Sequence, residues 1–133
     1  MIVKRIGAVL AGVLTAWLIV FIGDTVTHLF FPPPENIDFH DQEALKIFAE
    51  SIPWQSFVIM MLFWLLAAFA GGFVSAKINK PSWKRASIVT GSILLAGTIL
   101  NLILIPHPLW LIATSLILIV PSAYMGGKTA TLK

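Results

Sequence analysis

The sequence contains no cysteine and little charge. Its 133 residues include 9 Lys and Arg and 6 Asp and Glu, so 11% are charged, whereas soluble globular domains carry about 25%. The lack of cysteine excludes disulfides, thiolate metal sites, covalent haem attachment and thiol redox chemistry. The lack of charge excludes a soluble enzyme, a disordered chain and a nucleic-acid-binding domain, so we expect no nucleic-acid partner.

The few charges leave three uncharged runs, at residues 6–23, 51–76 and 86–127. A membrane-spanning helix needs about 20 apolar residues, so each of the first two runs fits one crossing. The third run is too long for one crossing, and Pro106-His107-Pro108 divides it. A cleaved signal peptide, the other interpretation of the first run, is disfavoured by the length of that run. We therefore predict an all-α membrane protein with one domain of four transmembrane helices, at about 6–30, 53–76, 86–105 and 109–127.

The basic residues predict how these helices are oriented. Eight of the nine lie in the N-terminus, in the connection 77–85 or in the C-terminal tail. By the positive-inside rule these segments face the cytoplasm, so we expect a multi-pass protein of a bacterial inner membrane with both termini cytoplasmic. All six carboxylates and all three histidines then fall on the outer side.

The outer loop 32–52 contains the pattern of a short amphipathic helix. Asp41 can cap its first turn, and Leu45, Phe48 and Ile52 recur at helical spacing. We expect this extracytoplasmic helix to lie on the bilayer surface or over the bundle.

Self-comparison indicates two tandem helical hairpins. Pro53 is followed by Gly71-Gly72 at the same spacing at which Pro108 is followed by Gly126-Gly127, and each glycine pair follows an alanine-aromatic-x sequence. The other explanation is that proline begins and glycine ends many helices. Because small residues let helices approach closely in lipid, we expect Gly71, Gly72, Gly126 and Gly127 to be helix-packing positions.

Polar groups that could carry chemistry gather near the predicted outer ends of the helices. Asp24 and His28 have i, i+4 spacing, His107 lies in the last turn between helices, and His40 lies on the outer loop. Two histidines and one carboxylate could bind zinc, copper or iron, and the same groups could contact haem or a quinone. A structural clasp of mutual hydrogen bonds is the preferred interpretation, so no cofactor is predicted.

Two polar residues, Thr98 and Asn101, lie inside the third predicted span. An intramembrane asparagine usually hydrogen-bonds across a helix interface, which is our expectation here. A transport path would instead require Thr90, Thr98 and Asn101 to face one cavity. No span has a charged residue between its interfaces, which argues against a proton relay.

Several segments resemble those of a group of small four-helix bacterial inner-membrane proteins of uncharacterised activity. They are 28–34, which leads into Glu43-Ala44-Leu45, then Asn101-Leu102 with 105–110, and the two Gly-Gly helix ends. The resemblance covers nearly the whole chain. It implies a bacterial inner membrane and the orientation given above, and it implies no substrate.

We therefore expect a non-catalytic membrane protein that acts as an accessory, scaffold or lipid-organising component. Its expected partners are the lipid bilayer and either a larger membrane complex or further copies of itself. One alternative is a small oligomeric transporter or channel with Thr98 and Asn101 on its path. The other is a metal, haem or quinone site at Asp24, His28 and His107.

Overall fold

A computed structural model describes residues 2–32, 38, 40–105 and 107–132 of the chain, and these residues form helices and short connections. Four helices are long and apolar enough to cross a membrane: α1 (Ile2–Phe30), α3 (Trp54–Ile78), α4 (Trp83–Leu104) and α5 (Leu109–Ala130). The prediction of an all-helical protein with four potential membrane spans is confirmed. Two shorter elements join them, α2 (Gln42–Ser51) and the 3-10 turn η1 (Lys80–Ser82).

Proline marks the start of two of the long helices. Pro53 and Pro108 directly precede α3 and α5, and both have extended backbones with ψ near 146° and 147°. Because proline has no N–H, it loses nothing at a position where the helix offers no acceptor. The prolines at 33, 34 and 106, which also contributed to the predicted boundaries, lie outside the described residues.

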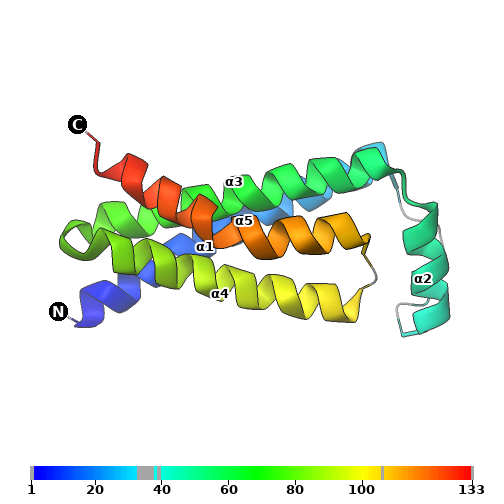
Figure 1. Ribbon diagram of the computed structural model, residues 1–133, viewed down its shortest axis with the longest axis horizontal. Helices are drawn as coiled ribbons and strands as arrows, with labels where there is room; N and C mark the ends of the chain where they lie inside the picture. Colours follow the sequence, from blue (N-terminus) through cyan, green and yellow to red (C-terminus); the bar gives the residue numbers. More distant parts are fainter. Residues whose placement is uncertain (1, 33–37, 39, 106, 133) are drawn as a thin grey trace.

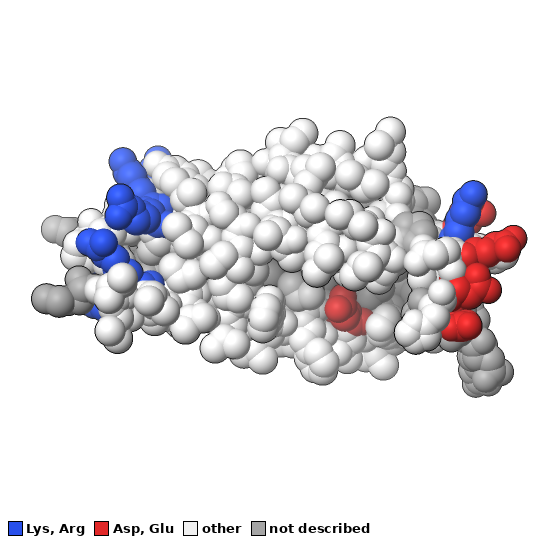
Figure 2. All heavy atoms as spheres, turned by 90° about the horizontal axis from the view of Figure 1, so that it is seen from below, with Lys and Arg blue, Asp and Glu red and all other residues white. Residues whose placement is uncertain are grey.

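The long helices pack around α3, which contacts α1, α4 and α5. Figure 1 shows both chain ends and the α3–α4 connection at one end of the bundle, whereas α2 lies across the other end. Figure 2 shows Lys and Arg gathered at the end that contains the chain termini, and most Asp and Glu at the α2 end. We call these the basic end and the acidic end. The surface between them is apolar, as at Phe21, Leu62 and Ile117, which are 70%, 61% and 66% exposed.

Glycines lie where the helix backbones approach most closely. A Cβ atom added to Gly72 would overlap the Ala123 carbonyl, and a Cβ atom added to Gly126 would overlap the Phe69 carbonyl. The α3–α5 crossing is therefore built from two reciprocal contacts between glycine and backbone. Such close approach maximises dispersion contacts where lipid gives little hydrophobic drive for association.

The other two glycines of the predicted packing set lie at the neighbouring crossings. A Cβ atom on Gly71 would lie 2.8 Å from the Gly12 carbonyl oxygen of α1, and a Cβ atom on Gly127 would lie 2.6 Å from the Ser87 side chain of α4. The buried hydroxyl groups of Ser75, Ser87, Thr90 and Ser115 bond within their own helices; for example, Thr90 donates to the Ala86 carbonyl at 2.8 Å. The hydroxyl of Thr90 is thereby satisfied without a partner on another helix.

Candidate functional site

The short helix α2 covers the acidic end of the bundle. The Asp41 carboxylate caps it by accepting a hydrogen bond of 3.0 Å from the Glu43 N–H, as the sequence predicted. Among the described residues, the backbone of α2 does not approach that of any other helix. The helix is held by its apolar face, on which Leu45 is only 5% exposed. Apart from its two-residue connection to α3, α2 is therefore attached to the bundle by side chains.

Beneath α2 lies a cavity of about 370 Å³, which we call the acidic-end cavity. It brings together residues from α1, α2, α3, α4 and the α4–α5 turn. Its apolar wall includes Leu45 and Phe48 of α2 and Phe57 and Trp64 of α3. Its polar lining residues are Asp24, Thr27, His28, Ser56, Asn101 and His107. Three of the four predicted cluster residues and the intramembrane asparagine thus line one cavity.

His107 is a partly buried polar group of this cavity. Its ring lies against two aromatic rings of α3, with centroid distances of 6.2 Å to Phe57 and 6.1 Å to Trp64. Its Nδ1 lies 2.7 Å from the Ile105 carbonyl oxygen. Since a carbonyl can only accept, Nδ1 carries the proton, and Nε2 of the neutral ring remains a hydrogen-bond acceptor.

Burial also favours the neutral form of this ring. The pKa of His107 is lowered from its ordinary value, mainly because burial penalises the imidazolium cation, while the hydrogen bond to Ile105 acts in the opposite direction. At neutral pH the ring therefore presents an uncharged acceptor nitrogen.

The remaining polar residues come from α1 and α4. Asp24 and His28, one turn apart on α1, both line the cavity, as their i, i+4 spacing predicted. Asn101 of α4 is half-buried, and its side-chain amide forms no hydrogen bond to another residue that the structure describes. His40, the fourth predicted cluster residue, lies apart; it is exposed, and its N–H donates to the Asp38 carboxylate at 2.9 Å.

A second hollow, the lateral groove, extends from this cavity along the seam between α1 and α4. It has a volume of about 370 Å³ and shares Val20, Trp64 and Asn101 with the acidic-end cavity. It continues two turns down α4 to Ile93, which is about 12 Å at about 1.5 Å per residue. Apart from Thr98 and Asn101, its lining is apolar or aromatic. The polar lining residues of cavity and groove are gathered at the α2 end, whereas the part of the groove from Gly97 to Ile93 is apolar.

Two of the alternatives from the sequence can be compared with this geometry. No group of three or more His, Asp or Glu side chains within the described part of the chain is placed to hold a metal ion. Thr98 and Asn101 line the lateral groove, but Thr90 is fully buried and its methyl group faces the Gly12–Gly71 contact. The three residues of the transport hypothesis therefore do not share one cavity.

Some residues of the site were missed by reasoning from the sequence. Trp17 and Trp64 both line the lateral groove, as does Gly97, at which an added Cβ would meet no atom within 4 Å. A signal was present on α4, where every fourth residue from Ile93 to Asn101 lines the groove. That spacing alone does not predict which other helix lies opposite these residues of α4.

Comparison with known proteins assigns no family to the chain. No protein-family model, no curated protein and no solved structure matches it. The candidate site therefore rests on the geometry of this chain: a cavity beneath α2 with six polar lining residues, which continues into a largely apolar groove along the seam between α1 and α4.

Proposed function

We propose that this protein is a non-catalytic, lipid-organising membrane protein that binds one amphiphile. The headgroup lies in the acidic-end cavity and the tail lies in the lateral groove. The observation that carries this proposal is that the two hollows share Val20, Trp64 and Asn101 and are polar at only one end. A single ligand with a polar head and an apolar tail matches that distribution. Each hollow also falls within the range of about 300–1,000 Å³ that is usual for ligand pockets.

The polar lining indicates the chemistry of the headgroup. The Asp24 carboxyl oxygens and the His107 Nε2 can accept hydrogen bonds, and the Asn101 amide and the His28 ring can both donate and accept. Acceptors in a half-buried site favour a ligand that brings donors, since unpaired polar groups are costly to bury. We infer a headgroup with hydroxyl or ammonium donors, flanked by the Phe57 and Trp64 rings.

The orientation predicted from the sequence completes the proposal. If the basic end faces the cytoplasm of a bacterium, the acidic-end cavity opens at the outer leaflet of the inner membrane. The ligand would enter sideways, because α1 and α4 leave the groove open between them. The reciprocal glycine contacts between α3 and α5 support the proposed origin of the chain from two tandem hairpins. The exposed apolar surfaces of the long helices could contact further copies of the chain or a larger membrane complex.

This function can be tested with a variant whose larger side chain fills the lateral groove and leaves the helix crossings unchanged. The variant is Gly97→Phe, because Gly97 lines the groove in open space. Its matched control is Gly7→Phe, because an added Cβ at Gly7 also meets nothing within 4 Å and Gly7 lies outside both hollows. Each protein is extracted from its own membranes in mild detergent and weighed by native mass spectrometry.

We expect wild type and Gly7→Phe to retain one amphiphile per chain and Gly97→Phe to lose it. Equal retention by Gly97→Phe would contradict binding in the groove. A wild-type chain that carries no amphiphile under conditions in which its fold is intact would contradict the function itself. A stoichiometric metal ion would instead support the metal-site alternative.

A further inference from the structure

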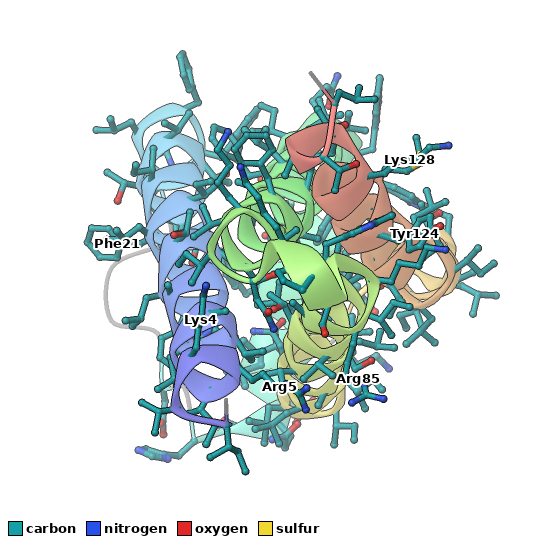
Figure 3. All side chains as sticks on the ribbon, turned by 90° about the vertical axis from the view of Figure 1, so that its left-hand side faces the viewer. Lys4, Arg5, Phe21, Arg85, Tyr124 and Lys128 are labelled. Atoms are coloured by element: carbon teal, nitrogen blue, oxygen red, sulfur yellow. The ribbon has the colours of Figure 1, made fainter. Side chains whose placement is uncertain are left out.

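A different groove opens at the basic end of the same α1–α4 seam. It has a volume of about 360 Å³ and shares no residue with the acidic-end cavity. Its polar lining consists of Arg5 of α1, Arg85 of α4 and Asn79 of the α3–α4 connection. In Figure 3, viewed from this end, Arg5 and Arg85 lie at the same edge of the bundle, where the ends of α1 and α4 are neighbours, and both line the groove. We call this hollow the basic-end groove.

These three polar groups suit a phosphate. Each guanidinium presents N–H donors in a planar fork that matches two phosphate oxygens, and two of them from separate helices can hold one phosphate from both sides. Asn79 is only 7% exposed and ends α3 by donating its backbone N–H to the Ser75 carbonyl at 3.1 Å. Its side-chain amide forms no hydrogen bond to any other described residue, so its donors are available to a ligand.

The neighbouring lysines are engaged differently. The Lys84 ammonium lies 5.7 Å from the centroid of the Trp83 ring, and the Lys77 ammonium lies 5.8 Å from that of Phe73. These distances are within the range of cation–π contact. The two arginines are therefore the cations of this end that line the groove.

The rest of the basic-end groove is apolar and leads away from the arginines toward the middle of the bundle. Ile6, Val9 and Leu10 of α1 face Val89 and Ile93 of α4 across it. Ile93 lies two turns beyond Arg85, about 12 Å along the helix, which is close to the thickness of one leaflet of a hydrocarbon core about 30 Å thick. A free phosphate ion would leave this apolar part empty, whereas an acyl chain would cover it.

We propose that Arg5, Arg85 and Asn79 bind the phosphate of an anionic phospholipid whose acyl chain lies along the basic-end groove. The positive charge selects an anionic over a zwitterionic headgroup, and the apolar seam selects a lipid over a soluble phosphate. The phosphate site is separate from the amphiphile's headgroup site, because no residue lines both the basic-end groove and the acidic-end cavity. The basic-end groove meets the lateral groove only at Ile93, which lines both. One protein would then hold a lipid in each leaflet along the same seam.

The test measures lipid adducts by native mass spectrometry on the purified full chain in mild detergent. Phosphatidylglycerol, phosphatidylcholine and inorganic phosphate are added separately. The test variant is Arg5→Gln/Arg85→Gln. The matched control is Lys4→Gln/Lys128→Gln, which removes the same charge at the same end from residues that lie outside the groove (Figure 3). Arg5→Lys/Arg85→Lys keeps the charge and removes the planar forks.

We expect wild type to bind one phosphatidylglycerol and to prefer it to phosphatidylcholine. The Gln pair should weaken this binding by about tenfold or more, the Lys pair by less, and the control pair hardly at all. Equal weakening in the control would show attraction to general surface charge and would overturn the site. Equal binding of phosphatidylcholine, or competition by millimolar inorganic phosphate, would overturn an anionic phospholipid as the ligand.

If the Gln pair does not fold, wild-type levels of binding by the Lys pair would overturn phosphate recognition by the guanidinium forks. Asn101→Leu, a change in the acidic-end cavity at a residue that lies outside the basic-end groove, should leave phosphatidylglycerol binding unchanged, so the two sites can fail separately.

Discussion

The α3–α5 crossing allows a sharp prediction about stability. Gly72 and Gly126 each touch the carbonyl of the opposite helix, so Gly72→Ala or Gly126→Ala places a methyl group against backbone that cannot rotate away. The helices must separate by about 1 Å, and a gap of that size forfeits up to about half of the dispersion energy of the contacting atoms. Overpacking of this kind costs about 1–3 kcal/mol.

The opposing term is the helix propensity of alanine, which favours the substitution by about 0.5–1 kcal/mol. We therefore expect each single variant to lose about 1–2 kcal/mol. Gly97→Ala, at a position where an added Cβ meets no atom within 4 Å, should lose nothing or gain up to about 1 kcal/mol. The double variant should lose less than the sum of the singles, because the first methyl group already separates the helices at the site of the second.

The assay is reversible unfolding of the purified protein by titrating sodium dodecyl sulfate into mild-detergent micelles, followed by circular dichroism. Each free energy of unfolding is compared with that of Gly97→Ala. If Gly72→Ala and Gly126→Ala are as stable as Gly97→Ala, the crossing is not packed as described. Losses that add fully in the double variant would show that the two contacts are not coupled through one crossing.

Three further predictions concern the acidic end. Leu45→Ala should speed amide hydrogen exchange in α2 while the long helices stay protected, because α2 packs on the bundle through its side chains. The control Ile47→Ala, at a position 62% exposed, should leave the exchange rates of α2 and of the long helices unchanged. Burial lowers the pKa of His107, so as pH falls below about 6.5 this histidine is protonated in the unfolded chain before it is protonated in the folded chain. The free energy of unfolding and the amphiphile retention should therefore decrease with pH, as measured by thermal melts and native mass spectra from about pH 8 to 5. The share of this decrease that comes from His107 should be absent in His107→Gln. Asn101→Leu should abolish amphiphile retention in native mass spectra but shift the free energy of unfolding by less than about 1 kcal/mol, since no hydrogen bond to another described residue is lost; a larger destabilisation would show that Asn101 fastens helices together.

The sequence predicted the helices well because membrane spans depend on local composition. Three uncharged runs, the last divided at Pro106-His107-Pro108, locate the four helices that are long and apolar enough to span a membrane. Asp41 with the apolar stripe at Leu45 and Phe48 locates α2. The i, i+4 spacing of Asp24 and His28 also predicted that both would face the same side.

The packing of these helices was much less predictable. In lipid both the outer and the inner face of a helix are apolar, so hydrophobic periodicity does not distinguish them. Trp17 and Trp64 look alike in the sequence, yet Trp17 is 62% exposed and Trp64 is 9% exposed. The central place of α3 and the seam between α1 and α4 likewise depend on contacts between distant segments.

The two proposed lipid sites illustrate the same limit. The positive-inside rule explains Arg5 and Arg85 completely as orientation signals, so nothing local indicates that they line one groove. Asn101 fits the pattern of a residue that joins helices, and only the structure places it between the acidic-end cavity and the lateral groove.

The central claim is that an amphiphile occupies the α1–α4 seam with its head at the acidic end. The most direct test is photo-crosslinking in vesicles with a lipid that has an ammonium headgroup and a photoreactive group in the acyl chain, followed by mapping of the labelled residues. Selective labelling of Trp17 and Gly97, which line the lateral groove and not the basic-end groove, over Ile117 of α5 is the predicted result, although Ile117 is 66% exposed and Trp17 is 62% exposed. Labelling of Ile117 at the same level as these groove residues would contradict the account, because the seam would then be ordinary lipid-facing surface.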